Sequence, residues 1–376
     1  MRNSEGSKFL RSIEASACFE MRANPGTSVR RAPEPSVHQS AENVTNYERL
    51  AEHSNGQKGA ETLTGQCCFH CGGELEKSVS GLFDTRFGIA GTYGVERCRQ
   101  CGLEQMSPVP TPEELNRLYQ SHYNFGGEKN TVYTNLREWF LSSFLYRLWI
   151  RLDGDVSFHA RTGTGRLLDV GCNEGRGLKI YARNGFQVEG LELNETAAAV
   201  ARDAGFTVHT CDLGQFTSLA PYDVVVLSNV LEHSLDPRQM LLDIRRILKS
   251  GGQVWISCPN SESWLRAVFG TSWINWHVPF HITQFSTETS KNLLSEAGFA
   301  AIETRQITPA LWVSSSLIAK LFAKKGRPTR ALRNPILVLG LLIVSRMIFF
   351  PALWLGNRVG RGDCLVITAR NPDLPR

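Results

Sequence analysis

From Arg166 onward, short apolar runs alternate with amphipathic stretches, and this rhythm limits the folds open to the chain more than any other feature. Residues 236–249 carry apolar side chains at helical spacing, and Gly251-Gly252 is expected to end that helix. Strands and helices in alternation predict an α/β fold with a doubly wound, Rossmann-like, mainly parallel sheet. The apolar runs are Leu167–Val170, Val188–Glu192, Tyr222–Leu227 and Gln253–Ser257.

Two CxxC pairs, each followed by glycine, lie ahead of this region: Cys68-x-x-Cys71-Gly72 and Cys98-x-x-Cys101-Gly102. A tight turn lets both thiolates of a pair face one ion, and the glycine lets the backbone curl behind them. Four thiolates predict structural zinc, because a closed four-cysteine site leaves no position for a reacting water. Chance pairing of buried cysteines is the alternative, and Cys67 is an alternative ligand.

Composition and pattern divide the chain into six predicted segments. Residues 1–64 are rich in Ser, Asn, Glu, Gly and Pro, which predicts a disordered tail. Thr111-Pro112-Glu113-Glu114 has the residues of a helix start. The segments are the tail (1–64), a zinc ribbon (65–108), a helical linker or cap (109–160), the main α/β domain (161–308), an apolar, basic helical insertion (309–361) and a last strand of the sheet (362–376).

The formal net charge of +5 is unevenly distributed. Ten basic residues and no acidic residue lie between Thr304 and Gly362, whereas the rest of the chain holds 31 basic and 36 acidic residues. A general nucleic-acid surface is therefore not expected, and no nucleic-acid partner is predicted. Residues 1–30 contain no apolar run as long as that of a signal peptide, so the sequence predicts a cytoplasmic protein.

The first apolar run leads into a glycine turn, Gly171-Cys172-Asn173-Glu174-Gly175. Such a turn at the start of a helix lets a nucleotide approach backbone N–H groups closely. Glu192 ends the next strand, where a carboxylate can accept hydrogen bonds from ribose, and Asp212 follows a third short strand, where an adenine amino group could lie. Asn173 replaces a glycine of the dinucleotide fingerprint, which disfavours a nicotinamide-dependent oxidoreductase. A structural turn with solvent-facing acids is the alternative.

Together these residues resemble the class I S-adenosylmethionine-dependent methyltransferases, in particular the branch of the ubiquinone-biosynthesis O-methyltransferases. The resemblance covers roughly residues 166–299, and the paired cysteine motif also resembles methyltransferases that act on nucleotide-linked sugars. Its marks are Leu-Asp-Val-Gly-Cys (168–172), Gly190-Leu-Glu192, Tyr222-Asp223-Val-Val, Val230-Leu-Glu232-His233, Leu248-Lys-Ser-Gly-Gly252 and Cys258-Pro259-Asn260.

The resemblance implies S-adenosylmethionine as cofactor and assigns roles to particular residues. Gly171 and Gly175 would cradle the methionine part of the cofactor, and Asn229 would lie beneath it. Glu192 would bind the ribose and Asp212 the adenine. Asn173 departs from the glycine of many members, which leaves the shape of the turn open. The predicted cofactor-binding residues are Asp169, Gly171, Asn173, Gly175, Glu192, Asp212 and Asn229.

Methyl transfer needs positioning and, where the acceptor must lose a proton, a base. His233 follows the fourth strand, at the edge where open α/β sheets bind substrates, and is predicted to be a base or a substrate-orienting group. A hydrogen-bonded, helix-capping histidine is the alternative. His277 and His281 are predicted to line the acceptor pocket, or else belong to an aromatic loop packed on the sheet edge. In related enzymes the Glu-His pair has been linked to a divalent metal, which the sequence leaves open.

Residues 335–356 are nearly long enough to span a bilayer, but Arg346 and Pro351 interrupt them. The predicted strands at 301–307 and 363–370 would pair, so a single crossing would leave the last strand on the wrong side of the membrane. We therefore expect an interfacial or re-entrant hairpin whose flanking basic residues meet an anionic membrane surface. A buried dimer or substrate-lid helix and true spanning are the alternatives.

These features predict an enzyme that transfers a methyl group to an oxygen, or a carbon, of a small-molecule, sugar-containing or lipid-linked acceptor. The expected location is the cytoplasm, with peripheral attachment to the inner face of a membrane. The alternative in another class is a catalytically inactive, membrane-docked binding or scaffold protein with the same fold.

Overall fold

The computed structural model describes residues 67–122 and 138–372. All of these belong to one compact unit. The predicted tail (1–64) lies outside the described residues, as do residues 123–137 and 373–376.

A seven-stranded sheet, in the order β10-β11-β8-β7-β4-β5-β6, lies at the centre of the described residues. Strands β4 to β8 pair in parallel, whereas β11 runs antiparallel to both β8 and β10. The predicted α/β fold with a mainly parallel sheet is therefore confirmed. Its strands are β4 (Arg166–Val170), β5 (Gln187–Leu191), β6 (Thr207–His209), β7 (Tyr222–Ser228), β8 (Leu248–Pro259), β10 (Ala300–Ile307) and β11 (Cys364–Arg370).

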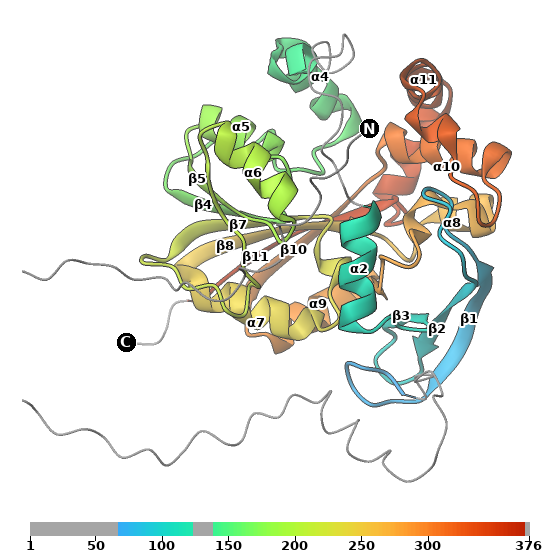
Figure 1. Ribbon diagram of the computed structural model, residues 1–376, viewed down its shortest axis with the longest axis horizontal. Helices are drawn as coiled ribbons and strands as arrows, with labels where there is room; N and C mark the ends of the chain where they lie inside the picture. Colours follow the sequence, from blue (N-terminus) through green and yellow to red (C-terminus); the bar gives the residue numbers. More distant parts are fainter. Residues whose placement is uncertain (1–66, 123–137, 373–376) are drawn as a thin grey trace, which may run out of the picture. The chain divides into compact units, whose positions relative to one another are not determined.

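The helices of the described residues are α2 (Pro112–His122), α4 (Phe144–Asp153), α5 (Arg176–Arg183), α6 (Glu195–Asp203), α7 (Pro237–Ile247), α8 (Trp264–Phe269), α9 (Thr287–Glu296), α10 (Ala310–Phe322) and α11 (Pro335–Arg358). Figure 1 shows α5 and α6 on one face of the sheet and α7 and α9 on the other. Val225 and Leu227 share a core with α7 and α9, whereas Val224 and Val226 pack with Tyr181 of α5. This alternation follows from the two-residue period of a strand. Short 3-10 turns are η1 (Leu231–His233), η2 (Gly270–Ser272), η3 (Ile274–Trp276) and η4 (Arg330–Arg333).

The predicted end of the helix before β8 is wrong. Helix α7 begins as expected, with the Asp236 carboxylate accepting a hydrogen bond from the backbone of Gln239, but it ends at Ile247. Strand β8 starts at Leu248, which is buried and pairs with Tyr222 of β7. Both glycines therefore lie within the strand. A Cβ at Gly252 would lie 2.9 Å from the carbonyl oxygen of Lys249, so close backbone contact explains this glycine.

A second sheet has four strands in the order β1-β2-β3-β9: β1 (Leu75–Leu82), β2 (Tyr93–Cys98), β3 (Glu104–Ser107) and β9 (Thr283–Gln284). Its first three strands form the predicted ribbon. The fourth comes from the segment that directly follows His281, and it pairs antiparallel with β3. The backbone N–H of Met106 extends the contact by donating to the carbonyl of Ile282 at 2.8 Å. The ribbon and the later segment are thus parts of one sheet.

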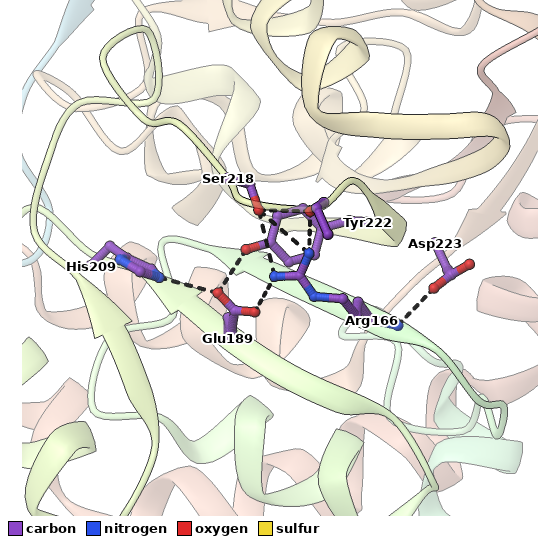
Figure 2. A network of polar contacts seen from close by, with 7 residues as sticks. Arg166, Glu189, His209, Ser218, Tyr222 and Asp223 are labelled. Atoms are coloured by element: carbon purple, nitrogen blue, oxygen red, sulfur yellow. Dashed lines mark hydrogen bonds and ion pairs between the residues drawn. The ribbon is translucent and has the colours of Figure 1, made fainter. Parts of the chain in front are cut away.

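A network of polar side chains joins neighbouring strands of the main sheet (Figure 2). The guanidinium of Arg166 bonds to the carboxylate of Glu189 and lies 4.4 Å from the ring centroid of Tyr222. The other oxygen of Glu189, Oε2, accepts a hydrogen bond from the Tyr222 hydroxyl at 2.8 Å and lies 3.2 Å from His209 Nε2. The backbone N–H of Arg166 donates to Asp223 at 2.7 Å. The network therefore connects β4, β5, β6 and β7.

Helices α10 and α11 connect β10 to β11, as the predicted insertion before the last strand requires. Helix α11 has 24 residues and a mean hydropathy of 2.4 over its most apolar window, of which 11% is buried. By length and composition alone, it is the described helix that could cross a membrane. Arg346, near its middle, lies 3.6 Å from the buried Asp153 at the end of α4. Asp153 also accepts the backbone N–H of Ala310, so it contacts α10 as well.

Candidate active site

The turn between β4 and α5 has the left-handed backbone that close approach of a ligand requires. Gly171 and Gly175 have φ values of 73° and 77°, and a Cβ at Gly175 would lie 2.8 Å from the Cβ of Ala201. Asn173 has a φ of 54°, and its side-chain oxygen accepts the backbone N–H of Glu174 at 2.9 Å. Asparagine adopts this conformation more readily than most residues. The turn therefore keeps a glycine-like shape at Asn173.

Glu192, directly after β5, is held against the same turn. One carboxylate oxygen accepts the backbone N–H of Asn173 and the other that of Asn194, both at 2.9 Å. An ionised carboxylate offers about four acceptor positions, so two remain for further donors. This carboxylate can consequently accept hydrogen bonds from a pair of neighbouring hydroxyls without changing its position.

The remaining predicted cofactor residues lie at or after the carboxyl ends of the parallel strands. Asp169 of β4 is buried, and this burial, with the nearby charge of Glu192, raises its pKa to about 8. Asp212 is exposed and follows β6. Asn229 follows β7 with a φ of 55° and donates its backbone N–H to the carbonyl of Ser257. The carboxyl ends of parallel strands form the edge where ligands of open α/β sheets bind.

The three predicted catalytic histidines meet at this edge, although they come from two segments. His233 ends η1, directly after β7, whereas His277 and His281 lie between η3 and β9. One ring nitrogen of each lies within 4.8 Å of those of the other two. The His281 ring centroid is 4.6 Å from that of His233 and 4.8 Å from that of His277. The structure thus brings together two sequence motifs separated by more than 40 residues.

Neighbouring groups orient the histidine rings. The Tyr119 hydroxyl of α2 lies 2.7 Å from His233 Nδ1. His281 Nδ1 lies 2.7 Å from the carbonyl oxygen of Asn275, so Nδ1 carries the proton and Nε2 carries the lone pair. Burial lowers the pKa of His233 to about 4 and lowers the pKa of His277 and His281 well below the ordinary value. The three rings are therefore neutral at pH 7.

Asp363, directly before β11, is a residue of this region that sequence reasoning missed. Its fully buried carboxylate accepts hydrogen bonds from Ser263 Oγ at 2.6 Å, Trp273 Nε1 at 2.8 Å and Asn275 Nδ2 at 3.0 Å. Burial raises its pKa to about 6, although these hydrogen bonds act in the opposite direction. Asp363 thereby fixes the Asn275 that orients His281. The sequence signal was an acidic residue that directly ends the acid-free stretch 304–362.

The four predicted zinc ligands also come together. The sulfur atoms of Cys68 and Cys101 are 3.7 Å apart, those of Cys71 and Cys98 are 3.4 Å apart, and all four lie within 4.8 Å of one another. Tetrahedral zinc with Zn–S bonds of about 2.3 Å needs S–S separations of about 3.8 Å. The cluster therefore fits zinc. Cys67 instead forms a backbone bridge with Glu74.

The glycine after each cysteine pair has the predicted role. Gly72 and Gly102 have φ values of 73° and 74°, and their N–H groups donate to the carbonyls of Cys68 and Cys98. Backbone N–H groups of residues 100 and 101 point to the sulfur of Cys98. Although burial acts against them, these hydrogen bonds lower the pKa of Cys98 to about 7 and favour its thiolate.

Part of the chain is similar in sequence to known proteins. Residues 142–304 match a family model described as a methyltransferase domain. Ubiquinone biosynthesis O-methyltransferases of Cronobacter sakazakii and Erwinia tasmaniensis are 33% and 34% identical to this chain. The alignments cover 30% and 35% of this chain and 51% and 58% of those proteins, so the chain spans about half the length of the curated relatives it matches. These matches confirm the predicted resemblance to methyltransferases.

Solved structures that are similar to this chain include an S-adenosylmethionine-dependent methyltransferase from Archaeoglobus fulgidus, with a TM-score of 0.39 and 21% identity. That similarity covers 64% of this chain and 100% of the other. The [4+2]-cyclase SpnF gives a TM-score of 0.45 and 17% identity, covering 71% of this chain and 98% of the cyclase.

Proposed function

We propose that this protein, whose residues 142–304 match a methyltransferase domain, transfers a methyl group from S-adenosylmethionine to an oxygen, or a carbon, of a small-molecule acceptor. The observation that carries the proposal is the carboxylate of Glu192, which two backbone N–H groups hold beside a left-handed glycine turn. A ribose diol is a ligand that such a carboxylate can recognise. Asp212 would then meet the adenine, while Gly171 and Gly175 leave room for the methionine part.

Methyl transfer is an in-line displacement at the methyl carbon. The acceptor atom forms a bond to that carbon while the bond from carbon to the sulfonium sulfur breaks, which leaves a neutral thioether. An acceptor hydroxyl also has to lose its proton, and His233 is the proposed base. Its pKa of about 4 keeps the ring unprotonated at pH 7, so it can accept that proton, although as a weak base. Tyr119 holds the ring in place through Nδ1.

Calorimetric titration with S-adenosylmethionine and with its demethylated product tests the cofactor assignment. We expect micromolar binding that Glu192→Ala abolishes, because the variant removes the diol acceptor. Glu195→Ala is the matched control, since Glu195 is an exposed carboxylate three residues away that pairs with Arg202. Failure of folded wild-type protein to bind either ligand would contradict the assignment and favour the inactive binding-protein alternative.

The role of His233 has a separate test. His233→Gln should lower the rate of methyl transfer about 100-fold, the lower end of what a general base contributes, and leave cofactor affinity unchanged. His209→Gln is the control, because His209 lies on β6 in the network of Figure 2 and not at the histidine cluster. The measurement is release of demethylated cofactor across a panel of phenolic, glycan and lipid-linked acceptors. Full turnover by His233→Gln would remove the residue from the mechanism.

We further propose that the acceptor is reached at an anionic membrane surface, where α4 and α11 lie in the lipid interface. Both helices expose large apolar side chains, and Arg346 and Asp153 join them. The acid-free, basic segment around α11 complements anionic headgroups, at about 1 kcal/mol for each basic residue near the surface. The exposed apolar residues are Phe144, Leu145, Leu148 and Leu152 on α4 and Ile336, Leu339, Ile343, Val344, Met347, Ile348, Phe349, Phe350, Trp354 and Leu355 on α11.

Flotation with phosphatidylcholine vesicles, with and without phosphatidylglycerol, tests this surface. We expect binding to the anionic vesicles that weakens with salt and that Ile348→Glu abolishes. Leu219→Glu is the matched control, since Leu219 is an equally apolar, exposed residue in the loop between β6 and β7. A detergent-free dimer that does not float would contradict the membrane proposal and support a buried interface helix.

We also propose that the four-cysteine cluster holds one structural zinc ion. Support comes from the sulfur separations, which match the tetrahedral geometry, and from the donor set of four thiolates. The ion would join the two knuckles of the ribbon and leave no position open for substrate. Purified, folded protein without a stoichiometric metal would contradict this.

A further inference from the structure

Glu232, which precedes His233, has a fully buried carboxylate without a hydrogen-bond partner in the part of the chain that the structure describes, which is unusual in a folded protein. It is 1% exposed, and neither carboxylate oxygen has a hydrogen-bond partner among the described residues. An ionised carboxylate buried without a partner costs several kcal/mol. Buried carboxylates in proteins are normally paired or bound to a metal ion. The structure therefore calls for a positive partner at this position.

The nearest ring nitrogen faces the carboxylate with its lone pair. His281 Nε2 lies 3.9 Å from Glu232 Oε1, and it is unprotonated because Nδ1 donates to the carbonyl of Asn275. His277 Nδ1 lies 3.3 Å from the same Nε2. Metal-binding histidines typically donate their second ring N–H to a carbonyl or carboxylate in this way, which fixes the ligand nitrogen. His281 is thus arranged as a metal ligand, with Asn275 and Asp363 behind it.

We propose that His233, His277 and His281 bind one divalent transition-metal ion, and that the carboxylate of Glu232 beside them balances its charge. Bonds of about 2.0–2.1 Å in a tetrahedral site place ligand nitrogens about 3.4 Å apart, close to the 3.3 Å between His277 and His281. Imidazole ligands favour zinc and similar metals, whereas magnesium prefers oxygen ligands. The metal charge would also compensate the buried carboxylate. This set of residues extends the Glu-His pair with two histidines from the loop before β9.

The site has a chemical use that rests on the proposed methyl transfer, although metal binding itself does not. A bound metal would supply a Lewis acid that lowers the pKa of an acceptor hydroxyl. With His233 as one of its ligands, the metal would take over the role proposed for that ring as base, and the acceptor proton would pass to solvent. The chain's own contribution is the position of the cluster, beside the turn that is proposed to hold the cofactor. Val230, three residues before His233, has its Cγ2 atom 2.9 Å from the position of a Cβ at Gly171.

Metal content measured by mass spectrometry, after loading the full-length protein with cobalt and removing excess ion, tests the site. We expect one equivalent at the cysteine cluster and a second at the histidines. His277→Ala and Glu232→Gln should each lose the second equivalent and keep the thiolate-to-cobalt absorption band. Cys98→Ser should lose that band and keep the second equivalent. His209→Ala, outside both clusters, should retain both.

Glu232→Gln keeps the shape of the side chain and removes only its charge. Loss of the second metal equivalent in this variant therefore does not require misfolding. Circular dichroism and cofactor titration on each variant establish that the fold and the cofactor site persist. A wild-type protein that binds cobalt solely through thiolates would overturn the proposal, whether or not it binds the cofactor. Two equivalents with absent cofactor binding would instead overturn the proposed function and leave the metal site standing.

Discussion

In the turn after β4, Asn173 replaces the expected glycine and still adopts the backbone conformation that the turn requires. Asn173 occupies a left-handed conformation in which its side chain bonds to the next backbone N–H and its own N–H bonds to Glu192. Two structural requirements therefore meet at one position: a positive φ and a donor for the carboxylate. Glycine would satisfy both, and asparagine does so with an additional hydrogen bond.

Substitutions at position 173 should separate these requirements. Asn173→Gly should keep the free energy of unfolding within about 1 kcal/mol of wild type, because glycine adopts positive φ without strain. Asn173→Val should lower it by about 1–3 kcal/mol and weaken cofactor binding, since a β-branched residue is strained there. Urea denaturation and calorimetry measure both effects. Equal stability of the glycine and valine variants would show that the turn does not require the left-handed backbone.

At the residue level, the sequence predicted those site residues that lie in local motifs. Glu192 and His233 follow strands and the four cysteines lie in turns, as their spacings indicated, and their roles stay predictions. Tyr119 carries no such signal, and Asp363 stands out in the sequence only as the acidic residue that ends the acid-free stretch. Each reaches the histidine cluster through contacts distant in sequence, from α2 and from the residue before β11. Such contacts depend on how the chain packs, which residue spacing does not encode.

Between elements, the pair of Arg346 and Asp153 joins α11 to α4, and Asp153 also accepts the first N–H of α10. Burial raises the pKa of Asp153 to about 6, so the arginine and the N–H together offset only part of the desolvation. One carboxylate thereby sets the relative position of three helices. Because both partners are largely buried, removal of Arg346 leaves the Asp153 carboxylate with a backbone N–H as its remaining compensation, and removal of Asp153 takes away the anion that pairs with Arg346.

Arg346→Met should therefore destabilise the protein by about 3 kcal/mol, within the range found when one partner of a buried ion pair is removed. The double variant Arg346→Met with Asp153→Asn should recover part of this loss, because no buried charge then remains unpaired. Thermal unfolding of the single and double variants measures the coupling. Strictly additive losses would contradict a direct interaction between the two side chains.

The network of Figure 2 predicts how stability depends on acid pH. Hydrogen bonds from Arg166, Tyr222 and His209 lower the pKa of Glu189 below its ordinary 4.5, although burial acts in the opposite direction. Lys249 and the backbone of Arg166 similarly lower that of Asp223 below 3.8. A carboxyl whose folded pKa is depressed stabilises the fold above its unfolded pKa and loses this contribution as pH falls through the folded value.

We therefore expect the free energy of unfolding to decrease as pH falls below about 4.5. Glu189→Gln should flatten this decrease and should cost about 1 kcal/mol at pH 7, since the pair with Arg166 is only partly buried. Urea titrations from pH 7 to pH 3 compare the variant with wild type. An unchanged pH profile for Glu189→Gln would show that the carboxylate is not responsible.

For the molecule as a whole, the sequence predicted the main sheet well because its strands are buried runs at regular intervals. The antiparallel last strand was also predicted, since residues 363–370 are apolar and follow the helical insertion. The pairing of β3 with β9 was not predicted. β9 has two residues, and its position depends on β3, which lies about 180 residues earlier in the chain. The end of α7 was missed because β8 begins before the glycines.

Removal of the proposed zinc should affect more than the ribbon. Chelation, or Cys71→Ser, should lower the melting temperature and raise hydrogen exchange at Thr283 and Gln284, because β9 pairs with the sheet that the cysteines hold. Exchange in β4 and β7 should change little. Hydrogen–deuterium exchange with mass spectrometry distinguishes these regions. Unchanged exchange at β9 would show that the four-stranded sheet persists without the metal.

The shared sheet also limits how this protein can be engineered. If the ribbon were an independent module, it could be exchanged between relatives by joining their genes at a point between residues 108 and 160. Here such a chimera would leave β3 facing a foreign edge strand and would remove the backbone contact of Met106 with Ile282. The transplantable piece is therefore discontinuous: the cysteine-bearing hairpin has to travel with the loop that carries His277 and His281. Recombination within this group of proteins should preserve the two segments as a pair.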